Sequence, residues 1–318
     1  MMITRDGSNG VEVLLGRRAD SMPAFPGYWA FPGGGLSRVD KLAVEELEQL
    51  DGPNAAAFAA IMREIVEELG FACVDGKIMV VDDAARSLVV ADKANWLPQV
   101  KQGNIPCDTS GIRHISSRTT PPFGPVLFEN TFLHIHGGSS QEVPQPSIVG
   151  QTEFVEFTWQ SAEQLLAKWK THEMKIAPPV VTLMMQLKRT LAQFGGDMES
   201  SAEEMEKRQI GRRSILFAYG VEVVPVKTAT LPPADHTNSY LIGDPEGDFV
   251  LVDPAARMRE GMEDLAVAVE RHNGNLLAIV FTHPHSDHLG DFDLLREAFD
   301  VPIWGSQQTS EQIPCQRI

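Results

Sequence analysis

Three glutamates at helical spacing are the first residues in the chain able to do chemistry together. Glu64, Glu67 and Glu68 occur in the segment AAAFAAIMREIVEELG. At about 100° per residue they share an arc of about 100°, so their carboxylates project from one side of a helix. Like charges at this spacing repel by about 0.2–0.5 kcal/mol per pair, and a hard cation such as Mg²⁺ replaces that repulsion with coordination. Taken alone, the three residues fit either a metal site or a solvated acidic helix face.

The surroundings of these glutamates favour the metal site. The segment FPGGG, residues 31–35, lies upstream, and glycines allow the backbone to approach a ligand closely. Arg63 stands next to Glu64, where a fixed cation can hold a carboxylate in place.

A second group of metal-binding residue types lies near residue 285. The segment THPHSDHLGD contains His283, His285, Asp287 and His288, so three of the nine histidines fall within six residues. It follows the apolar stretch LLAIVFT, and α/β sheets commonly display ligands at the carboxyl ends of their strands. Imidazole and carboxylate groups suit Zn²⁺. A surface loop would explain an isolated H-x-H, but H-x-H-x-D-H after a strand favours a metal site.

Hydrophobic patterning predicts the elements that position both groups. The carboxylate helix is expected over 55–69, with Asn54 as N-cap and Gly70 as its C-terminal stop. Around it we expect strands over 11–16, 77–81, 127–136 and 153–158, and helices over 161–170 and about 179–193. In the second half we expect strands over 215–225, 239–242, 249–252 and 276–282, with a helix over 262–272.

A change in composition divides the chain. Its 318 residues suit two domains or one large domain. Residues 195–213 are polar and charged, typical of a linker or an exposed helix. We therefore predict a first domain over 1–194, a linker over 195–213 and a second domain over 214–318.

Charge and composition exclude several classes of function. The formal net charge of −16 argues against non-specific nucleic-acid binding and against an anionic membrane surface. No apolar run approaches the roughly 20 residues that cross a bilayer, and the first ten residues do not resemble a secretory signal. Three scattered cysteines, Cys73, Cys107 and Cys315, fit a reducing compartment, so we expect a cytoplasmic protein.

The carboxylate segment resembles the Nudix box, G-x5-E-x7-R-E-U-x-E-E-x-G-U, where U is apolar. The second half of that pattern matches over residues 63–71, REIVEELGF. The first half departs, because Asp40 stands where the pattern has Glu and 22 residues rather than 7 separate it from Arg63. The resemblance covers about residues 1–192 and implies an α/β/α sandwich. It further implies that Glu64, Glu67, Glu68 and the Gly33 carbonyl bind Mg²⁺ or Mn²⁺, and that Arg63 orients the site.

The Nudix resemblance implies hydrolysis of a nucleoside diphosphate linked to another moiety. There the metal neutralises the diphosphate, while a carboxylate or metal-bound water supplies the nucleophile. The insertion of about 15 residues after Asp40 is similar to a subgroup that includes a peroxisomal coenzyme A diphosphatase. Residues 127–130, LFEN, differ from that subgroup's Arg-aromatic-Asp-Thr. Coenzyme A, a dinucleotide and an NDP-sugar therefore all remain as substrates.

The histidine segment resembles the metallo-β-lactamase signature, over about residues 216–306. The resemblance implies an αββα fold in which His283 and His285 belong to one metal and Asp287 and His288 to a second, with Asp253 in a structural role. The family's remaining ligands would lie beyond residue 318, so we expect only the first half of the fold here. Two protein ligands per metal are fewer than the three usual for catalytic zinc.

Three functional hypotheses remain from the sequence. The first is a metal-dependent Nudix hydrolase, with Arg63, Glu64, Glu67 and Glu68 as its catalytic group. The second is a zinc-dependent hydrolase of thioesterase, glyoxalase or ribonuclease type in a longer chain, with the Nudix half as specificity module. The third is a Nudix half that only binds a nucleotide.

Overall fold

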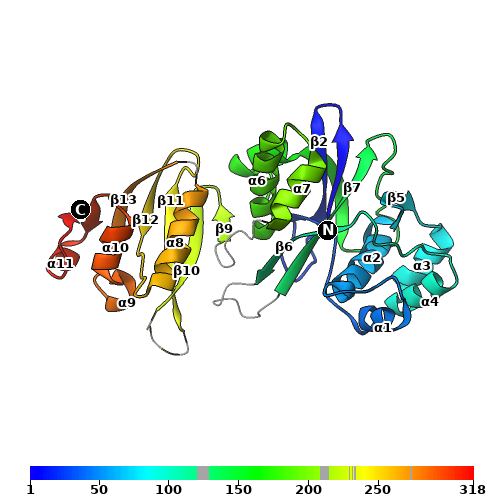
Figure 1. Ribbon diagram of the computed structural model, residues 1–318, viewed down its shortest axis with the longest axis horizontal. Coiled ribbons are helices and arrows are strands. Elements are labelled where there is room, and N and C mark those ends of the chain that lie inside the picture. Colours follow the sequence, from blue (N-terminus) through cyan, green and yellow to red (C-terminus); the bar gives the residue numbers. More distant parts are fainter. Residues whose placement is uncertain (120–128, 208–214, 229, 231, 233, 273) are drawn as a thin grey trace. The chain divides into compact units, whose positions relative to one another are not determined.

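The computed structural model describes residues 1–119, 129–207, 215–228, 230, 232, 234–272 and 274–318 (Figure 1). Backbone contacts divide the chain into two compact units, Met1–Ser116 with Thr131–Arg208, and Ser117–Asn130 with Gln209–Ile318. Each unit combines helices with its own sheet, which confirms the α+β class expected from the sequence.

The sheet of the first unit has the order β3-β2-β1-β7-β6, and β8 also pairs with β2. Strand β1 runs parallel to β7 and antiparallel to β2. A separate hairpin joins β4 to β5. The strands are β1 (Met2–Gly7), β2 (Gly10–Arg18), β3 (Trp29–Ala30), β4 (Phe71–Val74), β5 (Lys77–Val80), β6 (Arg113–Thr119), β7 (Glu129–Ser139) and β8 (Phe154–Ser161).

Helices lie on both sides of this sheet, as the α/β/α prediction requires. Figure 1 shows α2 with α1, α3 and α4 on one side, and α6 with α7 on the other. The apolar face of α2 joins Ile3 and Leu14 of the sheet in one core. The helices are α1 (Arg38–Glu46), α2 (Ala55–Leu69), α3 (Asp83–Ala91), α4 (Trp96–Lys101), α5 (Ala162–Lys170), α6 (Pro178–Gln193) and α7 (Met198–Lys207), with the 3₁₀ turn η1 (Lys93–Asn95) before α4.

The carboxylate helix α2 spans the residues that its pattern predicts. Gly70 ends the helix in the left-handed conformation, at φ +74°, and its N–H bonds the Val66 carbonyl at 3.1 Å. A glycine adopts this conformation without the steric penalty of a Cβ atom. Asn54 occupies the N-cap position, but its side chain makes no capping hydrogen bond.

Part of the predicted linker is a packed helix. Within 195–213, α7 buries Met198, Ala202 and Met205, and it packs against α6 in the first unit. These apolar residues recur at helical spacing, which explains how a mostly polar segment gains a buried face. The domain bounds 1–194 and 214–318 stay predictions.

The second unit contains a sheet of the order β15-β14-β13-β12-β11-β10-β9. The pairs from β9 to β12 are antiparallel and those from β12 to β15 are parallel. The strands are β9 (Ile215–Ala218), β10 (Val221–Lys227), β11 (His236–Gly243), β12 (Asp248–Val252), β13 (Asn275–Phe281), β14 (Ile303–Gly305) and β15 (Gln316–Arg317). The single strand expected over 215–225 is wrong, because a turn at Tyr219 and Gly220 divides it into β9 and β10.

Helices α8 and α10 pack with one face of this sheet into a core that includes Leu241, Leu251 and Ile279 (Figure 1). Ile242, which alternates with buried Leu241, is 42% exposed on the opposite face. In the part of the chain that the structure describes, this unit has one helix layer and one sheet. That these layers form the first half of an αββα fold stays a prediction. Its helices are α8 (Arg259–Arg271), α9 (Ser286–Leu289), α10 (Phe292–Ala298) and α11 (Gln307–Ser310).

Candidate functional sites

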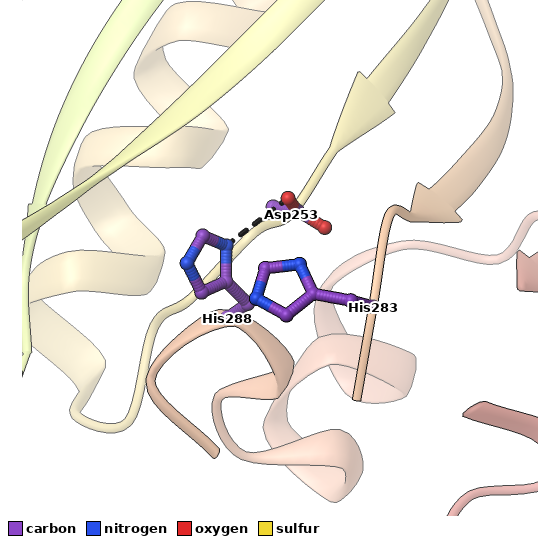
Figure 2. Close-up of side chains that lie close together, drawn as sticks. All are labelled: Asp253, His283 and His288. Carbon is purple, nitrogen blue, oxygen red and sulfur yellow. Dashed lines mark hydrogen bonds and ion pairs between the residues drawn. The ribbon is translucent and has the colours of Figure 1, made fainter. Parts of the chain in front are cut away.

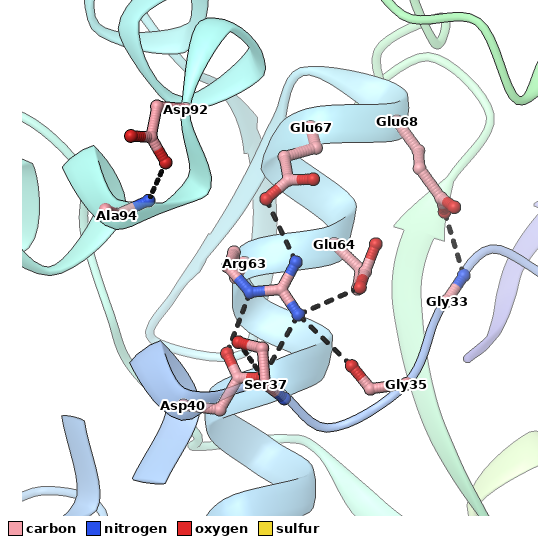
Figure 3. Close-up of polar contacts among 10 residues, drawn as sticks. All are labelled: Gly33, Gly35, Ser37, Asp40, Arg63, Glu64, Glu67, Glu68, Asp92 and Ala94. Carbon is pink, nitrogen blue, oxygen red and sulfur yellow. Dashed lines mark hydrogen bonds and ion pairs between the residues drawn. The ribbon is translucent and has the colours of Figure 1, made fainter. Parts of the chain in front are cut away.

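Arg63 forms the centre of the carboxylate site on α2 (Figure 3). Its side chain is only 2% exposed, and its guanidinium binds three carboxylates at once. Nε and Nη2 donate to the two oxygens of Asp40 at 2.8 and 3.0 Å. Nη2 also lies 2.9 Å from Glu64 Oε1, and Nη1 lies 3.0 Å from Glu67 Oε1. This fork fixes two of the predicted metal ligands in one orientation.

The insertion after Asp40 preserves this contact. Asp40 sits in the first turn of α1, where its Oδ2 accepts hydrogen bonds from Ser37 N at 2.7 Å and Ser37 Oγ at 2.9 Å. Inserted residues Ala43 and Leu47 pack into the core of the first unit. As a result Asp40 is fully buried against Arg63 even though its position in the Nudix pattern is normally Glu.

The glycine segment lies against the same carboxylates. Gly33 N donates to Glu68 Oε2 at 2.8 Å. A Cβ atom on Gly34 would come within 2.3 Å of Glu64 Oε1, so a larger residue there requires Glu64 to move. The backbone after β3 therefore lies directly against the carboxylates of Glu64 and Glu68 on α2.

Burial disfavours the charged form of all three glutamates. Burial raises the pKa of Glu64 to about 7, despite the nearby Arg63, and burial also raises the pKa of Glu67. The pKa of Glu68 is raised well above its usual range by burial, and then by the charges of Glu64 and Glu153. Glu153, just before β8, was not among the predicted site residues, and it lies outside the motif that identified the others.

One atom in particular is complementary to a cation. Glu68 Oε1 is buried and accepts no hydrogen bond from the described residues. An unpaired, buried carboxylate oxygen close to a second buried carboxylate, that of Glu64, is costly unless a cation neutralises it. The oxygen-only donor set of Glu64, Glu67 and Glu68 matches what Mg²⁺ and Mn²⁺ prefer.

The histidine site forms where two neighbouring strands end (Figure 2). Asp253 follows β12, and the segment with His283 and His288 follows β13, which pairs parallel to β12. Parallel strands bring their carboxyl ends to the same edge. One ligand atom each from Asp253, His283 and His288 lies within 4.8 Å of the others.

Asp253 orients the residues around it. Its Oδ1 accepts Thr282 N at 2.8 Å, and its Oδ2 accepts the Thr282 hydroxyl at 2.5 Å and His288 Nδ1 at 3.1 Å. Because that hydroxyl donates to Asp253, its oxygen accepts from His283 Nδ1 at 2.8 Å. Both histidines then present Nε2 as the free ligand atom, and such support of a metal-binding imidazole is common. These hydrogen bonds support the structural role predicted for Asp253.

The other two predicted ligands are arranged differently. The His285 ring lies beside that of His283, with centroids 4.6 Å apart. Asp287 Oδ2 accepts a hydrogen bond from Thr230 Oγ1 at 2.7 Å, which lowers the pKa of Asp287. The structure thus groups His283 and His288 with Asp253, whereas the assignment of His285 and Asp287 to metals stays a prediction. The two imidazoles suit Zn²⁺, and the carboxylate of Asp253 orients them.

Comparison with known proteins adds family evidence for the second unit. Residues 232–312 match the model of the metallo-beta-lactamase superfamily. The chain is 33% identical over 85 residues to the hydroxyacylglutathione hydrolase of Bdellovibrio bacteriovorus, covering 25% of this chain and 34% of that protein. It is also 33% identical over 88 residues to hydroxyacylglutathione hydrolase GloC of Haemophilus influenzae, covering 28% of this chain and 37% of that protein. The chain thus spans about a third of the length of these relatives.

The first unit resembles a solved NUDIX hydrolase from Alicyclobacillus acidocaldarius. The match has a TM-score of 0.50 and 22% identity, and covers 58% of this chain and 87% of that one. The chain combines a Nudix-like fold with a metallo-beta-lactamase-like domain. None of the helices in the described residues has the length and apolar character needed to span a bilayer.

Proposed function

We propose that the chain is a divalent-metal-dependent Nudix hydrolase that cleaves a phosphoanhydride bond in a nucleoside diphosphate linked to another moiety. The observation that carries this proposal is the buried Arg63–Asp40 pair, which holds Glu64 and Glu67 beside the unpartnered oxygen of Glu68. A solvated acidic helix face would not bury its carboxylates in this way.

Each residue then has a defined task. Glu64, Glu67 and Glu68, with the Gly33 carbonyl, would hold Mg²⁺ or Mn²⁺, which neutralises the charge of the diphosphate. Arg63 keeps Glu64 and Glu67 in place, so these groups need no rearrangement when the substrate binds. The Gly33 N–H fixes Glu68 through Oε2 and leaves Oε1 for the cation.

Within this class we propose a coenzyme A-like diphosphate, or a related dinucleotide or NDP-sugar, as substrate. The support is the lengthened segment between Asp40 and Arg63, which is similar to the subgroup with coenzyme A diphosphatase activity. Of residues 127–130, which differ from that subgroup, the first two lie outside the described residues, and Glu129 and Asn130 begin β7.

A hydrolysis screen with Mg²⁺ and Mn²⁺ tests the proposal. Coenzyme A, dinucleotides and NDP-sugars would be offered to the full chain with a zinc-selective chelator present. Glu67→Gln is expected to reduce metal-dependent turnover by about a hundredfold or more, since it removes one ligand charge. The matched control Glu163→Gln alters a carboxylate that is 77% exposed on α5 and should keep full activity. Full activity in Glu67→Gln would refute the assignment, and tight nucleotide binding without turnover would favour a binding module.

A second candidate is a zinc-dependent metallo-β-lactamase-fold hydrolase of thioesterase, glyoxalase or ribonuclease type, with the Nudix half as specificity module. It is favoured by the group of Asp253, His283 and His288 and by the two relatives named hydroxyacylglutathione hydrolase. Hydrolysis of a glutathione thioester that requires Zn²⁺ and is lost in His283→Ala would support it. Turnover that survives both zinc removal and His283→Ala would oppose it.

A further inference from the structure

Arg86, on α3, is a buried cation that neither candidate site accounts for. It is 5% exposed, and burial lowers the pKa of its guanidinium. The hydrogen bonds that the guanidinium donates to the described residues all end on backbone carbonyl oxygens. Burying a charge is costly, and neutral carbonyl partners compensate it less than a carboxylate would. The place of Arg86 in the fold therefore needs an explanation other than net stability.

Two of these carbonyls belong to the last turn of α2. Arg86 Nε donates to the Val66 carbonyl at 3.1 Å, and Nη2 donates to the Glu67 carbonyl at 3.0 Å. The last four carbonyls of a helix have no intrahelical partner, and a cation near them interacts favourably with the helix dipole. A Cβ atom on Gly70 would lie 3.3 Å from Arg86 Nε, so the glycine that ends the helix also leaves room for the guanidinium.

A third segment joins the same contact. Arg86 Nη2 also donates to the Ser147 carbonyl at 2.9 Å, and the Ser147 N–H bonds the Leu69 carbonyl at 3.0 Å. One guanidinium thus connects α3, the last turn of α2 and the segment that leads to β8. Helix ends commonly fray, and these contacts hold the end of α2 in one orientation.

The turn that Arg86 holds carries two of the three carboxylates of the site. Glu67 and Glu68 lie in this turn, and Glu64 lies one turn earlier. Glu67 is bound at both ends, because its Oε1 lies 3.0 Å from Arg63 Nη1 and its carbonyl accepts a hydrogen bond from Arg86. The three carboxylates share one side of the helix only while residues 67 and 68 keep helical geometry. Opening of the last turn would therefore remove two of the three candidate ligands.

We propose that Arg86 is a positioning residue of the carboxylate site, which preorganises Glu67 and Glu68 for a divalent cation by holding the last turn of α2. This inference rests on the proposed Nudix function and deepens it, because it adds a residue from outside the motif to the metal site. In this role Arg86 touches neither the metal nor the substrate. Loss of a residue that supports metal ligands typically weakens metal binding by about 10–100-fold.

The affinity of the full chain for Mn²⁺ tests this role without turnover. Electron paramagnetic resonance measures the free ion during a titration, and subtraction of the binding by Glu68→Gln removes ions held elsewhere. Arg86→Met has no donor and should weaken binding about tenfold or more. Arg86→Lys keeps the charge but not the planar fork, so it should weaken binding by less. The matched control Val181→Ala removes buried methyl groups from α6, on the other side of the sheet (Figure 1), and should leave the affinity unchanged.

The outcomes separate this inference from the function beneath it. Equal Mn²⁺ affinity in Arg86→Met and the unaltered chain would overturn the positioning role and leave the hydrolase proposal standing. An equal loss in Val181→Ala would also overturn it, because general destabilisation would then explain both variants. If Arg86→Met does not fold, Arg86→Lys decides, and unchanged affinity there would overturn the role. An unaltered chain that binds no more Mn²⁺ than Glu68→Gln and hydrolyses no diphosphate would overturn the proposed function and this inference with it.

Discussion

At the scale of single residues, the buried Arg63–Asp40 pair controls the carboxylate site. Both side chains are almost completely inaccessible, at 2% and 0% exposure. A buried ion pair adds little net stability over apolar packing, but removing one partner leaves an uncompensated charge that costs about 3–5 kcal/mol. Its value here is positional, because Arg63 holds Glu64 and Glu67 only while Asp40 holds Arg63.

Asp40→Asn is therefore expected to lower the free energy of unfolding by about 3 kcal/mol and to reduce metal-dependent hydrolysis. Urea denaturation gives the first quantity, and turnover at saturating Mg²⁺ gives the second. The matched control is Glu46→Gln, which breaks an exposed ion pair with Lys101 and should cost less than about 1 kcal/mol. Equal effects of the two substitutions would show that Asp40 is not the anchor of Arg63.

Asp253 is expected to support metal binding through its side chain, which orients His288 and Thr282, and not only through its strained backbone. Asp253→Asn keeps a residue that tolerates φ +46° but removes the negative charge that orients both neighbours. Loss of such an outer partner typically weakens metal binding by about 10–100-fold. A Zn²⁺ competition titration measures this loss, with exposed Asp300→Asn as control. Unchanged affinity in Asp253→Asn would remove Asp253 from the site.

The buried, neutral side chain of His134 is expected to make the folded state less stable at low pH. Burial lowers the pKa of His134 from its ordinary value of about 6.5 to about 3, and its Nε2 is hydrogen-bonded to Thr4 Oγ1 at 2.8 Å. The folded chain therefore keeps His134 neutral, whereas the unfolded chain binds a proton below about pH 6.5. Stability falls as the pH drops from about 6.5 toward 3. Urea denaturation at pH 7.5 and 4.5 should show a smaller difference in His134→Gln than in the unaltered chain, and an equal difference would contradict this.

At the scale of elements, the sequence predicts structure where the pattern is local. Helix α2 is found over its predicted residues because its apolar stripe is regular and Gly70 provides a left-handed stop. Helix α1 is not predicted from the sequence, because residues 38–47 contribute only a few small or scattered side chains to the core, such as Ala43 and Leu47. The contact between Asp253 and His288 depends on parallel pairing of β12 with β13, which no local pattern contains. Local motifs therefore predict the candidate ligands of both sites, but not contacts between distant segments such as Arg63 with Asp40, Gly33 with Glu68 and Asp253 with His288.

The end of α2 provides a test of its left-handed stop. Gly70→Ala should destabilise the chain by about 1 kcal/mol for the positive φ alone. A Cβ atom at this position would also lie 3.2 Å from Arg86 Cδ, which adds crowding. Gly195→Ala is the matched control, because Gly195 has φ +61° with open space around it. Denaturation curves should show a larger loss of the free energy of unfolding for Gly70→Ala than for Gly195→Ala. An equal or smaller loss would mean that the Arg86 side chain moves aside without strain.

At the scale of the whole molecule, the two units carry candidate metal-binding groups of different chemistry. The first group offers only carboxylate and carbonyl oxygens, and the second offers two imidazoles beside the carboxylate that orients them. Each unit has its own hydrophobic core. Cys73, Cys107 and Cys315 are free thiols, so no disulfide links them, although a cytoplasmic location stays a prediction. Hard and borderline cations should therefore act on separate parts of the chain.

This separation predicts that Mg²⁺ and Zn²⁺ protect different peptides from hydrogen exchange. A ligand at about 100 times its dissociation constant stabilises the state that binds it by about 2.7 kcal/mol. Mg²⁺ should slow exchange in α2, and Zn²⁺ should slow it around α9. Glu68→Gln should abolish only the first effect, His283→Ala only the second, and Glu163→Gln neither. Exchange measured by mass spectrometry resolves the two regions in one experiment. Protection of α2 by Zn²⁺ in His283→Ala would show that the carboxylates bind both metals, and the assignment of one cation to each unit would then be wrong.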